Sequence, residues 1–173
     1  MDGDIAVTSK PGQGTCFTVS LSLKRPLKPA VKSNAQTAAS LDSGVLRMDG
    51  ISILLAEDNE INSEIAAAIL EDCGASVTPV WNGKEAVDTF AASLPEQYKL
   101  ILMDIQMPAM DGLEASRTIR SLNRPDAKTI PILGLSANAF RHGLDAARQN
   151  GMNGYISKPL DITKMFETIR PYL

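Results

Sequence analysis

Polar residues able to do chemistry follow four separate apolar runs of this 173-residue sequence. Glu57 and Asp58 come directly after one run, and Asp104 ends another. Ser136 ends a third run, and Lys158 follows a fourth. Carboxylates at short range cannot all stay ionised without compensation, which a bound divalent cation provides. Because the available ligands are hard oxygens, this set favours Mg²⁺ over Zn²⁺.

The same residue types suit phosphoryl transfer. An aspartate carboxylate can form an acyl phosphate, which makes Asp104 the candidate nucleophile. Lys158 supplies a fixed positive charge that can neutralise phosphoryl oxygens during the transfer. The Ser136 hydroxyl can donate a hydrogen bond to one of those oxygens. We therefore expect Mg²⁺-dependent phosphate chemistry at a site built from separate parts of the sequence.

The elements that must position these side chains lie between residues 49 and 173. Apolar runs alternate there with amphipathic stretches, which is typical of βα units on a parallel sheet. The carboxyl ends of parallel strands meet at one edge of the sheet, so the polar residues converge on one crevice. We expect strands at 51–56, 75–80, 99–103, 130–135 and 154–157.

A helix is expected after each strand. The spacing of Ile61, Ile65 and Ile69 marks the first, and Gly74 fits its C-terminal stop. The second helix should face the core with Ala86, Val87, Phe90 and Ala91. The third helix begins near residue 112, the fourth covers 139–150, and the last covers 162–172.

Two further segments precede this region. Residues 1–24 alternate apolar and polar side chains around a turn, which predicts a short β piece. Residues 25–48 offer almost nothing to bury and predict a flexible linker. A net charge of -3 argues against a nucleic-acid partner. No apolar run approaches the length of a bilayer span, so we expect no membrane contact by this chain. The two cysteines, Cys16 and Cys73, have no CxxC or Cys/His spacing, and we expect reduced thiols and a cytoplasmic location.

Residues 51–173 resemble the receiver domain of two-component response regulators and hybrid histidine kinases. The resemblance implies an α/β, flavodoxin-like (βα)5 fold, with a parallel five-stranded sheet of order 2-1-3-4-5 and helices on both faces. The domain would then occupy residues 49–173. The matching stretches are ILLAEDN at 53–59, LMDIQMPAMDG at 102–112, LSANA at 135–139 and YISKPL at 155–160.

The resemblance also implies the metal and phosphoryl chemistry residue by residue. Asp104 is then the phosphoacceptor. Asp58, Asp104 and the backbone carbonyl of Gln106 are ligands of Mg²⁺, with Mn²⁺ as the alternative ion. Glu57 acts through a metal-bound water. The resemblance further places the Lys158 ammonium against the phosphoryl group.

Switching is implied in the same way. Ser136 moves onto the phosphate, and Tyr155 turns inward as the aromatic switch. The Lys158–Pro159 bond is expected to be cis, which X–Pro bonds tolerate. Gln106 and Asn138 occupy the two positions that tune phosphoryl lifetime, and neither is an acid.

Residues 5–17 are similar to the end of a histidine-kinase ATP-binding domain. The parent is then a hybrid histidine kinase, which can itself be membrane-anchored, and this chain lacks the kinase core. The chain would catalyse only its own phosphorylation and dephosphorylation. Its implied partner is a histidine-containing phosphotransfer protein or the kinase's own histidine domain. A homodimer through the parent kinase stays open.

Three other functions fit parts of the pattern. A degenerate receiver would act only as a protein-binding module, but such domains usually lose an acid or the lysine. An aspartyl-phosphate phosphatase typically carries an acid/base Asp two residues after the nucleophile, where this chain has Gln106. A flavin-binding protein of the same fold needs a phosphate-cradling loop after the first strand, and the sequence offers none there.

Overall fold

The structure of the chain is a computed structural model that describes residues 3–12, 14–21, 46–137 and 149–173. The chain divides into two compact units, residues 1–40 and 41–173, and each is described by itself. Residues 139–148 of the helix expected at 139–150 and the lifetime-tuning Asn138 lie outside the described residues, as does most of the linker segment.

The first unit contains an antiparallel hairpin of β1 (Gly3–Lys10) and β2 (Gly14–Leu21), the two strands that the sequence predicts. Ile5 lies opposite Val19, and Val7 lies opposite Phe17. Because cross-strand partners share a face of the ribbon, these four apolar side chains form one face. Each of the four is more than half exposed.

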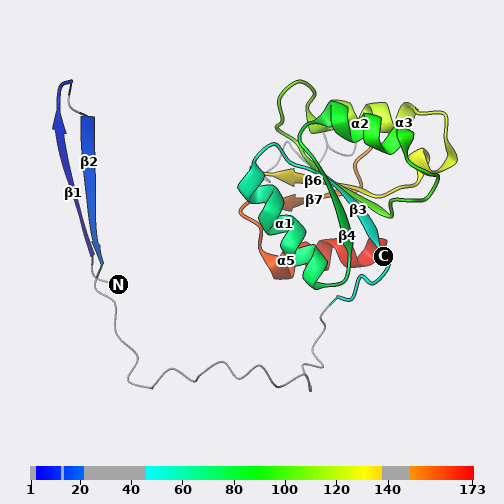
Figure 1. Cartoon of the computed structure of the whole chain (residues 1–173), viewed down its shortest axis with the longest axis horizontal. Helices are drawn as coiled ribbons and strands as arrows, with labels where there is room; N and C mark the ends of the chain where they lie inside the picture. The colour runs from blue at the N-terminus through cyan, green and yellow to red at the C-terminus, as the bar shows by residue number, and fades with distance from the viewer. Residues whose placement is uncertain (1–2, 13, 22–45, 138–148) are drawn as a thin grey trace, which may run out of the picture. The chain divides into compact units, whose positions relative to one another are not determined.

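The second unit is built on five parallel strands in the order β4-β3-β5-β6-β7, drawn in Figure 1. In chain order this is second, first, third, fourth and fifth, as the resemblance implied. The expected fold class is therefore confirmed. The strands are β3 (Ser52–Ala56), β4 (Ser76–Val80), β5 (Leu100–Asp104), β6 (Ile132–Ser136) and β7 (Gly154–Ser157).

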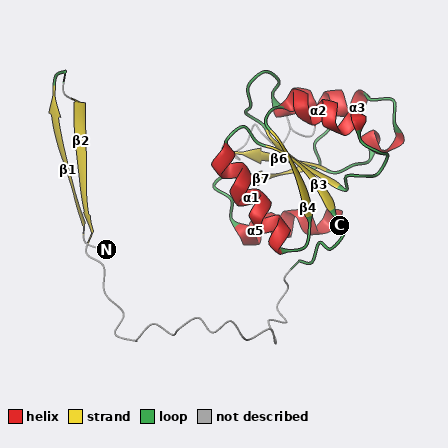
Figure 2. Ribbon diagram, viewed as in Figure 1, coloured by secondary structure: helices red, strands yellow, loops and turns green. Residues whose placement is uncertain are grey.

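Helices cover both faces of this sheet, with α1 and α5 on one side and α2 and α3 on the other (Figure 2). Each begins at an Asn or Asp whose side chain accepts the backbone N–H three residues later, satisfying a donor that the helix itself leaves free. They are α1 (Glu60–Asp72), α2 (Gly83–Ala92), α3 (Gly112–Ser121) and α5 (Ile162–Ile169), with short 3₁₀ helices η1 (Pro125–Lys128) and η2 (Arg170–Tyr172).

Alternation along the buried strands produces two cores. Leu54 and Ile101 point toward α2 and α3, whereas Ile53 and Leu102 point toward α1 and α5. Met48 is fully buried in the second core, and its N–H donates to the Cys73 carbonyl at 2.8 Å. The last residue of the segment expected to be a linker therefore contributes to this core.

The helix that Ile61, Ile65 and Ile69 mark is present, but the inward face predicted for α2 needs one correction. Ile61 and Ile65 of α1 are 67% and 49% exposed, and α1 buries Ser63, Ala66 and Leu70. The spacing of apolar residues identifies a helix, but small residues let its other face lie closer to the sheet. Ala91 of α2 is exposed, because it lies about 100° around the helix from buried Phe90.

The last helix is also shorter than expected. Regular α-helix ends at Ile169, and residues 170–172 form a 3₁₀ turn. Pro171 lacks an N–H, so the backbone there cannot continue the α-helical hydrogen-bond pattern. Gly74 ends α1 as predicted, because its φ of 94° is a left-handed conformation that stops the helix. Among the described residues, no helix combines the length and the hydropathy that a bilayer span requires.

Candidate functional site

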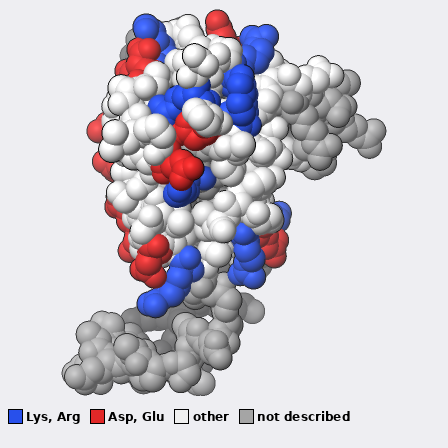
Figure 3. Space-filling view, turned by 90° about the vertical axis from the view of Figure 1, so that its right-hand side faces the viewer, with Lys and Arg blue, Asp and Glu red and all other residues white. Residues whose placement is uncertain are grey.

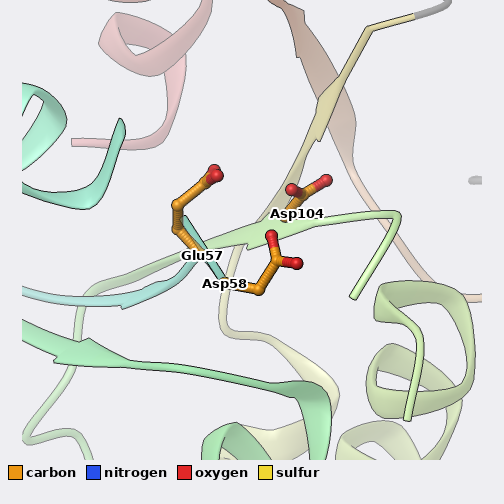
Figure 4. Close-up of side chains that lie close together, drawn as sticks. All are labelled: Glu57, Asp58 and Asp104. Atoms are coloured by element: carbon orange, nitrogen blue, oxygen red, sulfur yellow. The ribbon is translucent and has the colours of Figure 1, made fainter. Parts of the chain in front are cut away.

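The three acidic side chains predicted to cooperate do come together. Glu57 and Asp58 directly follow β3, and Asp104 ends β5, which pairs with β3 in the sheet. One carboxylate oxygen from each of the three lies within 4.8 Å of the others. Figure 4 shows the three groups converging on one space from the ends of the two strands. This edge of the sheet is therefore an acidic pocket able to hold a cation.

Lys158 joins this cluster from the loop after β7. Its Nζ lies 2.6 Å from Asp104 Oδ2 and 2.5 Å from Glu57 Oε2. The backbone N–H of Lys158 donates to the Ser136 carbonyl at 2.7 Å, which ties this loop to the end of β6. The strand ends thus bring together four residues from three separate segments of the sequence. The expected cis peptide between Lys158 and Pro159 is present.

One backbone donor and one side-chain donor fix the orientation of the candidate nucleophile. The Gln106 N–H donates to Asp104 Oδ1 at 3.0 Å, while Lys158 donates to Oδ2. Both carboxylate oxygens of Asp104 therefore have a protein donor. Asp104 is only 6% exposed, so its carboxylate is held by fixed partners rather than by bulk water.

Asn62 is a contributor that the sequence analysis missed. Its Nδ2 donates to Glu57 Oε1 at 3.0 Å, so both oxygens of this buried carboxylate are also satisfied. Asn62 stands in the first turn of α1, whose N-cap is Asn59. The sequence did contain a signal for this contact, because Asn62 is a polar side chain only a few residues after the acidic pair Glu57 and Asp58. The amide orients Glu57 without adding charge.

The charges in the site do not balance. Three acidic side chains, Glu57, Asp58 and Asp104, meet the single basic side chain of Lys158. Burial alone lowers the pKa of the Lys158 ammonium, but its hydrogen bonds to Asp104 and Glu57 outweigh that effect and raise the pKa above its ordinary value. The lysine is therefore charged at neutral pH, and the remaining negative charge favours a bound cation.

The donor set fits a hard divalent ion. All three acidic ligands offer oxygen, and neither Cys nor His lies among them. Asp58 is exposed whereas Glu57 is 1% exposed, so the site is open to solvent on the Asp58 side. The residues present are therefore suited to Mg²⁺.

Ser136 and Tyr155 occupy neighbouring strands beside this cluster. Ser136 ends β6 and pairs in register with Ser157, while Tyr155 pairs with Gly134. Both side chains are half-buried, and Gln106 is exposed. The two candidate switch residues thus lie on adjacent strands, one of them at the strand end beside the acidic pocket.

A groove runs beside the site, between α1 and the loop after β7. Its volume is about 250 Å³, and its lining is mainly apolar, formed by Asn62, Ile65, Lys158, Pro159 and Leu160. The wider surface is electrically mixed, because Lys and Arg side chains are interspersed with Asp and Glu on the face in Figure 3. The groove is thus an apolar surface that reaches Lys158 of the acidic cluster.

Comparisons with known proteins agree with this geometry. The chain is 33% identical over 172 residues to the aerobic respiration control sensor protein ArcB of Escherichia coli strain K12. That match covers 99% of this chain and 21% of the sensor protein, so the chain spans about a fifth of its relative.

Two solved structures share the fold. One is the receiver domain of a sensor histidine kinase from Pseudomonas aeruginosa PAO1, with a magnesium ion coordinated in its active site cleft. It is 34% identical with a TM-score of 0.64, over 71% of this chain and 97% of that one. The other is the Saccharomyces cerevisiae complex of the histidine phosphotransfer protein Ypd1 with the receiver domain of Ssk1. It is 27% identical with a TM-score of 0.62, over 70% of this chain and 88% of that one.

The family description "response regulator receiver domain" matches residues 53–170. These residues include every strand of the parallel sheet except the start of β3, and they contain the acidic pocket and its lysine. The chain therefore belongs to the response regulator receiver domain family, in which two-component phosphorelay signalling is the shared function.

Proposed function

We propose that the chain accepts a phosphoryl group on Asp104 from a phosphohistidine, in a step that depends on Mg²⁺. The observation that carries this proposal is the arrangement around Asp104, with the Lys158 ammonium 2.6 Å from one oxygen and two further carboxylates within 4.8 Å. A nucleophile, a fixed positive charge and a cation pocket thus surround one carboxylate, which is the set that phosphoryl transfer requires.

The transfer exchanges one bond for another. An Asp104 carboxylate oxygen attacks phosphorus in line with the phosphorus–nitrogen bond of the donor histidine. That bond breaks, its electron pair returns to the imidazole nitrogen, and an acyl phosphate forms on Asp104. Lys158 neutralises charge on the phosphoryl oxygens, and the Ser136 hydroxyl donates a hydrogen bond to one of them.

The metal ligands in this proposal are Asp58, Asp104 and the Gln106 backbone carbonyl, with Glu57 acting through a bound water. When bound, Mg²⁺ supplies positive charge that offsets the carboxylates and the incoming phosphoryl oxygens. Mn²⁺ is the alternative ion. The magnesium ion in the related Pseudomonas receiver domain supports this assignment.

Signalling then follows from two side chains on neighbouring strands. Ser136 moves onto the phosphoryl group, and Tyr155 turns inward into the space that the movement opens. The position of Ser136 at the end of β6, bonded through its carbonyl to the Lys158 N–H, supports a response to events at Asp104.

The donor in this proposal is a histidine-containing phosphotransfer protein or the histidine domain of the parent kinase. Ile61 and Ile65 leave an exposed apolar strip on α1, and the groove beside Lys158 continues from Ile65 to Leu160. A helical partner seated there would bring its histidine to the rim of the acidic pocket. The yeast complex of Ypd1 with a receiver domain supports a partner of this class.

The parent protein is then a hybrid histidine kinase. The match to ArcB extends over 99% of this chain, so it includes the hairpin as well as the receiver domain. In this proposal residues 1–24 are the end of the ATP-binding domain, residues 25–48 are the connection, and 49–173 are the receiver. Strands β1 and β2 supply a hairpin with one exposed apolar face, as expected of a piece that completes a larger domain.

An amide NMR titration tests the proposed function. Adding Mg²⁺ to the full chain should produce saturable shifts around Asp58 and Asp104. Adding beryllofluoride, which mimics an aspartyl phosphate, should extend the shifts to Ser136, Lys158 and Tyr155. The Asp104→Asn variant should fold yet lose the beryllofluoride response. If the unmodified chain responds to neither addition, it is only a binding module and the proposal is wrong.

A further inference from the structure

The first residue of α2 lies against the loop that follows the candidate nucleophile. The Gly83 N–H donates to the Met110 carbonyl at 3.2 Å. A Cβ on Gly83 would lie only 2.5 Å from the Met110 carbonyl oxygen and 3.1 Å from that of Asp111. It would also lie 2.9 Å from the Cβ of Ala115 on α3. Only a residue without a side chain fits this position, because two of the three contacts are backbone atoms.

The loop that Gly83 touches, residues 105–111, carries the proposed metal ligand Gln106. It is a closed turn whose two ends are joined, because the Gly112 N–H donates to the Ile105 carbonyl at 3.0 Å. Within this loop the Met110 N–H donates to the Pro108 carbonyl at 2.8 Å, and Ala109 has a left-handed φ of 66°. Such a turn has little freedom to absorb a push at one point, so a displacement of Met110 moves its other residues.

The inner end of the same loop holds Asp104. The Gln106 N–H fixes Asp104 Oδ1, and the Gly112 position lies directly over the Asp104 backbone, where a Cβ would meet the Asp104 carbonyl oxygen. The contacts therefore join α2 to Met110 and Met110 to Pro108 in the loop, while the Gln106 N–H of the same loop holds Asp104. We propose that Gly83 is a positioning residue for the metal and phosphoryl site, which it serves by letting α2 hold the 105–111 loop in place.

This role rests on the proposed function, because it assigns Gly83 to the site where Mg²⁺ and the phosphoryl group bind. Gly83 touches neither ligand and acts only through the loop. Replacing a residue that orients the metal ligands without touching the metal typically lowers metal affinity by about tenfold to a hundredfold. The Gly83→Ala variant should accordingly bind Mg²⁺ at least about tenfold more weakly than the unmodified chain.

The test is a calorimetric Mg²⁺ titration of the full chain, with two control variants on the same helix. Lys84→Ala alters the exposed neighbour of Gly83, and its affinity should stay unchanged. Phe90→Leu disturbs the buried face of α2 near the end of the helix opposite Gly83, so it should lower the melting temperature but leave Mg²⁺ affinity unchanged. In metal-free protein, Gly83→Ala alone should shift the Gln106 amide resonance, a readout that does not require a loaded site.

The double variant Gly83→Ala with Ala115→Gly separates the contact that the new methyl group would make with α3 from its contacts with the two backbone carbonyls. It removes the clash with α3 and keeps the clash with the Met110 carbonyl, so it should fold yet stay weak in Mg²⁺ binding. Restored affinity in the double variant would show that helix packing is responsible and would overturn the proposal. Unchanged affinity in Gly83→Ala would do the same. If the unmodified chain itself binds no Mg²⁺, the proposed function has failed instead.

Discussion

Lys158 Nζ lies 2.6 Å from Asp104 Oδ2, although 54 positions separate the two residues in the sequence. The same ammonium contacts Glu57, so it offsets part of the charge of two buried carboxylates. A metal ion bound at this edge would face both the attraction of the carboxylates and the repulsion of the lysine. The lysine should therefore weaken the binding of Mg²⁺ and favour the binding of the negatively charged phosphoryl group.

Replacing this lysine by an uncharged side chain of similar length should separate those effects. We expect Lys158→Met to bind Mg²⁺ roughly tenfold more tightly, because about 1.4 kcal/mol of cation repulsion is removed. Phosphoryl acceptance should fall by about a hundredfold or more, because the charge that neutralises the phosphoryl oxygens is lost. Calorimetry and a phosphorylation time course measure the two quantities. The exposed Lys84→Met is the control, and weaker Mg²⁺ binding in Lys158→Met would contradict this account.

A second ion pair, between Arg124 and Asp126, should control how the stability of the fold changes at acid pH. Arg124 and Asp126 are 2.7 Å apart, and the two side chains are only 13% and 9% exposed. Hydrogen bonds from Arg124, together with one from the Glu96 N–H, hold the pKa of Asp126 at about 2, although burial acts in the opposite direction. The ordinary value is 3.8. A lowered pKa stabilises the fold above the unfolded value, and this contribution disappears as pH falls through the folded value.

Asp126→Asn should therefore lower the free energy of unfolding at neutral pH by about 2 kcal/mol. The difference from the unmodified chain should shrink as pH falls below about 4 and approach its minimum near pH 2. Urea unfolding at a series of pH values measures it. Asp88→Asn breaks an exposed pair with Lys84 and should cost less than about 1 kcal/mol. A difference that does not vary with pH would show that the charge of Asp126 is not responsible.

Ser116 offers a route to greater stability. Its hydroxyl is fully buried in α3 and has no hydrogen-bond partner in the described part of the chain. A buried polar group without a partner costs about 1–3 kcal/mol, so Ser116→Ala should raise the free energy of unfolding by about 1 kcal/mol. Ser121→Ala on the same helix removes a hydroxyl that donates to the Thr118 carbonyl, and should give no gain. A loss of stability in Ser116→Ala would contradict the assignment.

Met48 should behave as part of the receiver core. It is fully buried among α1 and α5 side chains, so Met48→Ala should lower the free energy of unfolding by about 2–4 kcal/mol. Leu94→Ala, at a side chain that is 73% exposed, should change it by less than about 0.5 kcal/mol. Equal effects in thermal or urea unfolding would mean that Met48 does not anchor the segment before β3.

The sheet and the acidic pocket could be predicted because both depend on local signals. The apolar runs are long enough to mark buried strands, and parallel strands place their carboxyl ends at one edge. Glu57, Asp58 and Asp104 therefore had to meet once the strands were placed. The family resemblance supplied the strand order, which the runs alone do not determine.

The missed features depend on contacts between distant segments. The exposure of Ile61 and Ile65 is decided by which face of α1 reaches the sheet, and helical spacing does not contain that information. The hydrogen bond from Asn62 to Glu57 and the close approach of Gly83 to Met110 appear only when separate elements meet. Pro171 illustrates a local signal that was overlooked, because a proline near the end of a helix marks where regular hydrogen bonding stops.

The most direct test of the account is whether Asp104 itself becomes phosphorylated. The full chain would be incubated with Mg²⁺ and acetyl phosphate, and the site of modification located by peptide mass spectrometry after chemical trapping of the acyl phosphate. The account predicts one phosphoryl group on Asp104, none on the Asp104→Asn variant, and normal labelling of Asp111→Asn, which keeps the cap of α3. Labelling of Asp104→Asn at the level of the unmodified chain would contradict the account.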